Sequence, residues 1–171
     1  MVTAVTSTAV ILPRLGPRVP ITLGMVLGTI GLLLLTQIGV DTAYATHVLP
    51  GLIVTGLGLG LVFAVSFEVG TMGVGADDSG VASAMVNTTQ QVGGSIGTAL
   101  LSTIFASAVT AFALGSSDPG SPATQAAAQV NGYATAFWWS AGIFAAAAII
   151  CGLLLTKDAP DHDPSVPRVA A

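Results

Sequence analysis

Four long apolar runs, separated by short polar connections, constrain the fold of this 171-residue chain more than any other feature. They cover about 20–39, 49–71, 81–112 and 133–156. A helix needs about 20 mostly apolar residues to cross the hydrocarbon core of a bilayer, and each run has that length. The sequence therefore predicts an all-α membrane protein with four transmembrane helices in region 20–156, and the lipid bilayer is its first expected partner.

The charge content excludes several other classes of protein. Only 7% of the residues are charged, whereas a soluble domain carries about 25%. The chain has four lysines and arginines in total, too few for a nucleic-acid interface. The sequence contains no nucleophile motif and no paired intramembrane carboxylates, and no metal-ligand spacing surrounds the single Cys151. We therefore expect no enzyme activity, no cofactor and no metal site.

The positions of the cations predict the topology. Arg14 and Arg18 precede the first apolar run, whereas Lys157 and Arg168 follow the fourth. Four spans place both ends on one side of the membrane, and the positive-inside rule makes that side cytoplasmic. We therefore expect a multi-pass protein of the plasma membrane with a cytoplasmic C-terminus.

The connections follow from this topology. Residues 13–19 are predicted to form a cytoplasmic loop, and the Gly-, Ser- and Pro-rich segment 115–131 a flexible outer loop. The proline- and aspartate-rich tail 157–171 is predicted to be disordered. Residues 1–12 are apolar but too short to span the bilayer, and we expect them to be the end of a transmembrane helix whose beginning is missing.

Glycines recur four residues apart in three of the apolar runs. Such pairs place two small residues on one helix face and allow two helices to approach closely in lipid. Glycine is also simply frequent in membrane helices, so that each single pair is weak evidence. The pairs predicted to pack are Gly24 with Gly28, Gly56 with Gly60, and Gly93 with Gly97.

A polar stripe runs along the third apolar run. At 100° per residue its members share one helix face, and Val92, Ile96 and Leu100 lie opposite. Unsatisfied polar groups are costly in lipid, so the stripe is expected to meet another helix or a water-filled cavity. Hydrogen bonding between helices and the lining of a substrate pathway both remain open. The stripe consists of Ser83, Asn87, Gln90, Gln91, Gly94 and Thr98.

Glu68 is the one ionisable residue inside an apolar run. Ionisable groups at membrane depth often carry function, and a proton-linked role is one interpretation. Glu68 is, however, about 12 Å from the predicted middle of its helix, so its carboxylate can nearly reach the interface. Anchoring there, or pairing with a cation such as Arg14, is the interpretation that we favour.

The segment DSGVASAMVNTTQQVGGSIGTALLSTI, residues 78–104, resembles a signature of the major facilitator superfamily. It is similar to the penultimate helix of the fourteen-span drug:proton antiporters of the EmrB/QacA type. Supporting segments are HVLPGL at 47–52, GLGLGLVF at 56–63 and YATAFWWS at 133–140. The resemblance extends from Thr6 to Lys157. In the cytoplasmic loop Arg14, Gly16 and Arg18 match the superfamily motif, but its acidic residue and leading glycine are absent.

The resemblance implies the end of span ten and all of spans eleven to fourteen, within the C-terminal bundle. The chain would then be the C-terminal part of a proton-coupled multidrug efflux transporter. Its expected partners are the missing N-terminal half, small lipophilic substrates and protons, and the isolated chain is expected to be inactive. The alternative is a small membrane interaction protein that assembles through its glycine-rich helix faces, with a transporter half as one partner.

Overall fold

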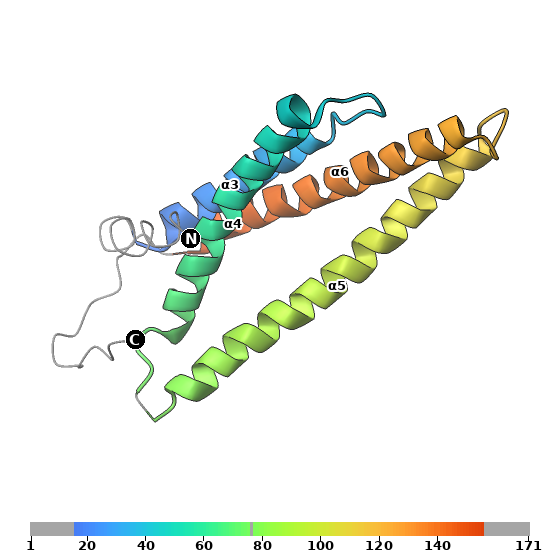
Figure 1. Cartoon of the computed structure of the whole chain (residues 1–171). Coiled ribbons are helices and arrows are strands. Elements are labelled where there is room, and N and C mark those ends of the chain that lie inside the picture. The colour runs from blue at the N-terminus through green and yellow to red at the C-terminus, as the bar shows by residue number, and fades with distance from the viewer. Residues whose placement is uncertain (1–15, 76, 156–171) are drawn as a thin grey trace.

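The computed structural model describes residues 16–75 and 77–155, and they form four long helices (Figure 1). The helices are α3 (Arg18–Leu35), α4 (Leu49–Thr71), α5 (Ser79–Leu114) and α6 (Pro122–Leu154), with a π-helical turn, Tyr44–Val48, leading into α4. Each long helix has the length and apolar composition to cross a membrane. The part of the chain that the structure describes contains no strand, and the predicted all-α membrane fold is confirmed.

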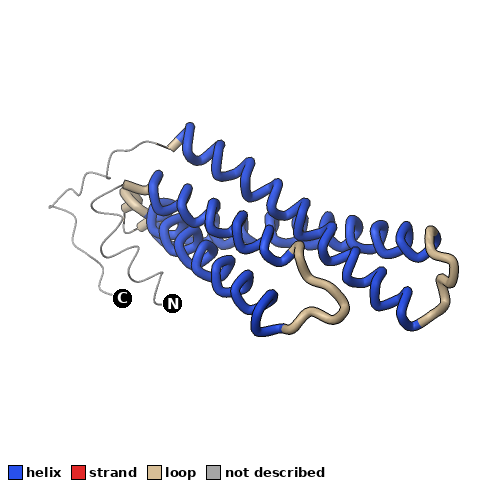
Figure 2. Tube along the Cα trace, turned by 90° about the horizontal axis from the view of Figure 1, so that it is seen from above, coloured by secondary structure: helices blue, strands red, loops and turns tan. Residues whose placement is uncertain are grey.

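Helices α3, α4 and α6 pack together, whereas α5 diverges from them. Figures 1 and 2 show α5 joined to α6 at one end and separating from α6 toward its start. Near that start, the side chain of Val86 packs against Gly70 of α4. Val65 of α4 is completely buried, and Ile21 of α3 packs beside it. Cys151 of α6 contacts the same cluster as a free cysteine. No residue of α5 is buried within the described part of the chain.

Glycine brings the backbones of α3 and α4 into direct contact. A Cβ atom on Gly58 of α4 would lie only 2.5 Å from the carbonyl oxygen of Gly24, and one on Gly31 would lie 2.8 Å from that of Gly51. The two contacts are seven residues apart in each helix, so they recur on one face after two turns. We call Gly24, Gly31, Gly51 and Gly58 the glycine seam; at these four positions there is no room for a side chain.

Helix α6 packs against α3 and against α5. Its Phe144 ring covers Gly28 of α3, where a Cβ atom would be 2.6 Å from the ring. Toward its start, Gly132 packs in the same way against Phe105 of α5. The ring centroids of Phe105 and Tyr133 are 4.7 Å apart, within the range of a favourable aromatic pair. Small residues facing aromatic rings thus hold both interfaces of α6.

The longest helices exceed the thickness of a bilayer. With 36 residues, α5 is about 54 Å long at 1.5 Å per residue, against a hydrocarbon core of about 30 Å. Both views show the α5–α6 connection lying beyond the α3–α4 connection (Figures 1 and 2). This end of the α5–α6 hairpin therefore extends past the region that the shorter helix α3 can span.

The largest difference from the sequence prediction is at the start of α6. Residues 122–131 are helical, so the expected flexible loop is confined to the connection before Pro122, and the prediction for the rest was wrong. The Ser121 hydroxyl accepts a hydrogen bond from the Thr124 backbone N–H at 3.2 Å. Pro122 at the first helical position and the alanines at 126–128 also favour helix.

Smaller differences affect the other helix boundaries. Arg18 begins α3 rather than lying in the predicted loop 13–19, and α3 ends at Leu35, four residues before the predicted boundary. There the Thr36 hydroxyl donates to the carbonyl oxygen of Leu33. Helix α5 is two residues longer than predicted at each end, whereas α4 has the predicted bounds. The predictions for 1–12 and 157–171 lie outside the described residues.

Candidate functional site

The polar stripe lies on the helix that is least covered by its neighbours. Ser83 and Gln90 are half-buried on the side of α5 that faces the other helices. The remaining members, Asn87, Gln91, Gly94 and Thr98, are exposed. The structure therefore places the whole stripe on one helix and leaves most of it without a contacting helix in the described part of the chain.

The hydroxyl groups of α5 are hydrogen-bonded within their own helix. Thr88, Thr98 and Thr103 donate to the carbonyl oxygens four residues earlier at 2.8, 2.8 and 2.9 Å. Ser95 donates to the carbonyl oxygen of Gln91 at 2.8 Å in the same way. Because this bond satisfies the donor locally, these residues need no partner from outside the helix.

The side-chain amides of α5 have no such local solution. Asn87, Gln90 and Gln91 make no side-chain hydrogen bond to any residue that the structure describes. Each amide offers two donor hydrogens and an acceptor oxygen. An unsatisfied polar group in hydrocarbon costs several kcal/mol, so three of them cannot face lipid tails on a stable transmembrane helix. This face requires water, a polar ligand or another polar helix.

The glycines of α5 also meet open space, and Gly94 lies on the same face as Asn87 and Gln91. Nothing among the described residues lies within 4 Å of a Cβ atom built on Gly93, Gly94 or Gly97. The predicted pair Gly93–Gly97 thus makes no helix contact in this part of the chain. The face combines hydrogen-bonding amides with places where another backbone or a flat ligand could approach closely.

Only part of the other glycine predictions agrees with the packing. Gly24 and Gly28 both contact neighbouring helices. On α4, however, Gly56 meets open space and Gly60 is half-buried, whereas Gly51 and Gly58 face α3. The interface with α3 thus uses other glycines of α4, and the predicted packing through Gly56 and Gly60 stays a prediction. The seven-residue spacing from Gly51 to Gly58, which matches Gly24 to Gly31, is the signal that could have found this interface.

The ionisable residues are peripheral to this face. Glu68 is half-buried near the end of α4, and its backbone carbonyl accepts a hydrogen bond from the Thr71 hydroxyl at 3.2 Å. Arg18 is half-buried at the start of α3. Arg14, the cation predicted to pair with Glu68, lies outside the described residues, so that pairing stays a prediction. No three His, Cys, Asp or Glu side chains of the described residues are grouped to hold a metal ion.

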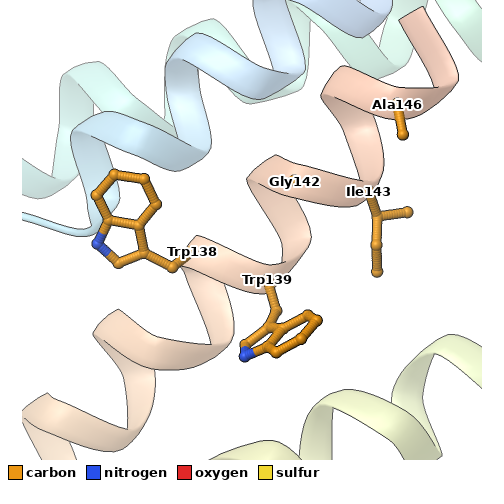
Figure 3. Close-up of a pocket in the computed structure, with 5 residues that line it drawn as sticks. All are labelled: Trp138, Trp139, Gly142, Ile143 and Ala146. Carbon is orange, nitrogen blue, oxygen red and sulfur yellow. The ribbon is translucent and has the colours of Figure 1, made fainter.

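Two tryptophans form an additional surface on α6. Trp138 and Trp139 are 61% and 58% exposed, and their indole rings point to different sides of the helix (Figure 3). Gly142, Ile143 and Ala146 complete an open apolar hollow of about 340 Å³ beside them. A second hollow of about 410 Å³ joins Trp139 to Thr103 and Ser107 of α5. This second hollow is thus lined by one aromatic ring, by the hydroxyl groups of Thr103, Ser107 and Thr135, and by the apolar Ile104 and Ala108.

The fold and this surface define a class of protein. The chain is an all-α, multi-pass membrane protein, and the polar face of α5 is uncovered among the residues that the structure describes. Faces of this kind line aqueous pathways or join other helices, and they are not typical of simple membrane anchors.

Comparison with known proteins identifies relatives of one kind. The chain is 36% identical to a puromycin resistance protein of Streptomyces alboniger over 148 residues, which are 85% of this chain and 29% of that protein. It is 36% identical to a cephamycin export protein of Amycolatopsis lactamdurans over 62% of this chain and 20% of the relative. A probable actinorhodin transporter of Streptomyces coelicolor is 32% identical over 57% of the chain and 17% of its own length.

These similarities support a role in membrane transport. All three relatives are named for resistance, export or transport. The chain spans less than a third of the length of each of them. No protein-family model matches the chain, and no solved structure matches it.

Proposed function

We propose that the chain is the C-terminal part of a proton-coupled exporter of small lipophilic compounds. The exporter would be a fourteen-span drug:proton antiporter of the major facilitator superfamily, in the plasma membrane with a cytoplasmic C-terminus. The observation that carries this proposal is the open face of α5, with three amides that need polar partners, in a chain similar to antibiotic resistance and export proteins.

In the proposed transporter, this face of α5 turns toward the half of the protein that precedes the chain. Asn87 and Gln91, which are exposed, would line an aqueous cavity near the middle of the membrane. Their amides would donate to and accept from the polar groups of a largely apolar drug. Gly94, one turn beyond Gln91 on the same face, would admit the drug close to the backbone of α5.

Glu68 has a secondary place in this proposal. Its position near the end of α4 suits an interfacial anchor better than a proton relay at the membrane centre. The proton gradient would drive export through carboxylates in the half that precedes the chain, in keeping with the antiporter resemblance. The isolated chain would therefore bind membranes but not transport.

A chimeric transporter tests the proposal. The part of the puromycin resistance protein that precedes its match to this chain would be joined to residues 1–171 and produced in a puromycin-sensitive host. We expect the chimera to confer resistance and to export puromycin in a manner abolished by a protonophore. We expect no export from the chain alone, because one bundle cannot enclose a cavity.

Two variants separate a cavity wall from a general effect on folding. Gln91→Ala should weaken drug recognition by about fivefold, the equivalent of one hydrogen bond. Leu100 lies on the opposite face of α5 and is 47% exposed. Leu100→Ala is therefore the matched control and should retain export. Equal export by both variants at equal protein levels would contradict the assignment of this face to the cavity.

The uncovered glycines of α5 also support a second candidate, a membrane interaction protein. Gly93, Gly94 and Gly97 offer a surface on which a helix of a separate protein could pack, since they meet open space among the described residues. A Gly97→Cys variant in a Cys151→Ala background would be tested for crosslinking to other membrane proteins. Crosslinks formed by the chain alone, together with a chimera that does not export, would favour this candidate.

A further inference from the structure

Helix α3 presents one continuous apolar face to its surroundings. Its exposed large side chains follow one another at intervals of three or four residues, the spacing of a single helix face. They are Val19, Leu23, Val26, Ile30 and Leu34, between 36% and 46% exposed. In a bilayer, a face of this composition lies against acyl chains.

At its N-terminal end this face leads into a hollow between α3 and α6. The hollow has a volume of about 370 Å³ and is lined by Arg18, Val19, Thr22, Leu23 and Val26 of α3 and by Gly152 of α6. Gly152 matters because it has no side chain: a Cβ atom there would lie 3.6 Å from the Thr22 methyl carbon. The absent side chain keeps the hollow open toward α6.

The charge at the mouth of the hollow has no counterpart in the described structure. Arg18 is half-buried and makes no hydrogen bond or ion pair with the residues that the structure describes. The first turn of α3 contains no acidic residue, and no side chain caps it. The positive end of the helix dipole therefore adds to the guanidinium charge, and both favour an anion at this point.

One turn further along α3, a buried hydroxyl also lacks a partner. The Thr22 oxygen is shielded from solvent and makes no hydrogen bond within the described part of the chain. Other threonines of the same structure bond their own helix, for example Thr29, which donates to the carbonyl oxygen of Met25 at 2.9 Å. Thr22 itself lines the hollow, so that a polar group bound there would supply the missing partner.

We propose that this hollow binds an anionic phospholipid. The phosphate would contact the Arg18 guanidinium and the Thr22 hydroxyl, and one acyl chain would lie along Val19, Leu23 and Val26. The order along the helix fits a lipid, since the charged residue is at the helix end and the apolar residues follow toward the membrane interior. The proposal does not depend on transport activity.

The test uses the full chain in detergent micelles with equal amounts of phosphatidylglycerol and phosphatidylcholine. Native mass spectrometry would measure how much of each lipid stays bound. We expect preferential retention of phosphatidylglycerol, reduced about fivefold by Arg18→Gln and restored in large part by Arg18→Lys. Thr22→Val, which keeps the side-chain shape, should reduce retention about threefold.

Thr29→Val is the matched control for Thr22→Val. It removes a hydroxyl from the same helix, but one that already has its partner, so lipid retention should not change. Equal retention of the two lipids, or equal effects of the two threonine variants, would overturn the proposal. Displacement of phosphatidylglycerol by millimolar inorganic phosphate would also overturn it, because the site would then bind a soluble anion.

Discussion

The glycine seam makes a sharp prediction about substitution at Gly58. A Cβ atom there would lie 2.5 Å from the Gly24 carbonyl oxygen and 2.7 Å from the Gly28 backbone nitrogen. Both neighbours are backbone atoms, which cannot rotate away, so α3 and α4 must separate locally. Reaching the 3.4 Å of an ordinary contact requires a displacement of about 0.9 Å.

The energetic cost follows from that displacement. A gap of 0.5–1 Å removes about a quarter to a half of the dispersion energy of the atom pairs that it separates. Overpacking of this kind typically costs about 1–3 kcal/mol. We therefore expect Gly58→Ala to lower the free energy of unfolding by about 2 kcal/mol relative to an alanine substitution without a clash.

Gly56→Ala is the reference substitution without a clash. Gly56 lies two residues before Gly58 on α4, and a Cβ atom there would meet nothing within 4 Å among the described residues. Both substitutions gain the same helix propensity of alanine over glycine, about 1 kcal/mol. The difference between the two variants therefore isolates the backbone contact between α3 and α4.

Cys151 provides the reporter for this experiment. It is the one cysteine of the chain and packs against the cluster of Ile21 and Val65. Thermal unfolding in micelles would be followed by its reaction with a fluorogenic thiol reagent. We expect the transition of Gly58→Ala to fall about 5 °C below that of Gly56→Ala. Coincident transitions would refute the argument that the seam forms a close backbone contact.

Three further outcomes are expected. In a Cys151→Ala background, Ser117→Cys in the α5–α6 connection should react with a membrane-impermeant maleimide added to intact cells, because this end extends past the span of α3. Ser121→Ala should destabilise the start of α6 by about 1 kcal/mol, through loss of the hydrogen bond from Thr124, and speed hydrogen exchange there. Thr98→Val should leave the unfolding transition unchanged within about 0.5 kcal/mol, since its hydroxyl bonds its own helix.

Each of these has a result that would count against it. Labelling of Asp77→Cys but not Ser117→Cys in intact cells would reverse the predicted topology. Unchanged exchange in Ser121→Ala would show that Pro122 and the alanines after it start the helix unaided. A large destabilisation by Thr98→Val would mean that its hydroxyl has a partner beyond the carbonyl oxygen of Gly94.

The helices were predictable from the sequence because their apolar content and length are local properties. The bounds of α4 follow from the apolar run alone. The early start of α6 depends instead on a cap at Ser121 and on alanines that follow a Gly-, Ser- and Pro-rich stretch typical of a loop. Hydropathy distinguishes lipid-compatible segments, and α6 begins in a polar segment that is helical without being strongly apolar. Helix propensity and capping, rather than hydropathy, decide that boundary.

Which glycines meet was not predictable from pairs within one helix. Gly56 and Gly60 satisfy the spacing rule, yet Gly51 and Gly58 face α3, because packing depends on how two helices match. The polar stripe on α5 was predictable as a face, since it follows from helical periodicity. That its hydroxyls are satisfied internally while its amides are not is a side-chain property that only the structure reveals.

The contact between Gly28 and Phe144 has a consequence for how the chain assembles. The glycine seam joins neighbouring helices, so α3 and α4 can associate as soon as both have entered the membrane. Gly28 and Phe144, in contrast, are 116 positions apart in the sequence, and contacts between distant segments form late because loop closure is entropically costly. During synthesis, Gly28 is therefore covered only once α6 has entered the membrane, and truncation before α6 would leave Gly28 without its contact with Phe144.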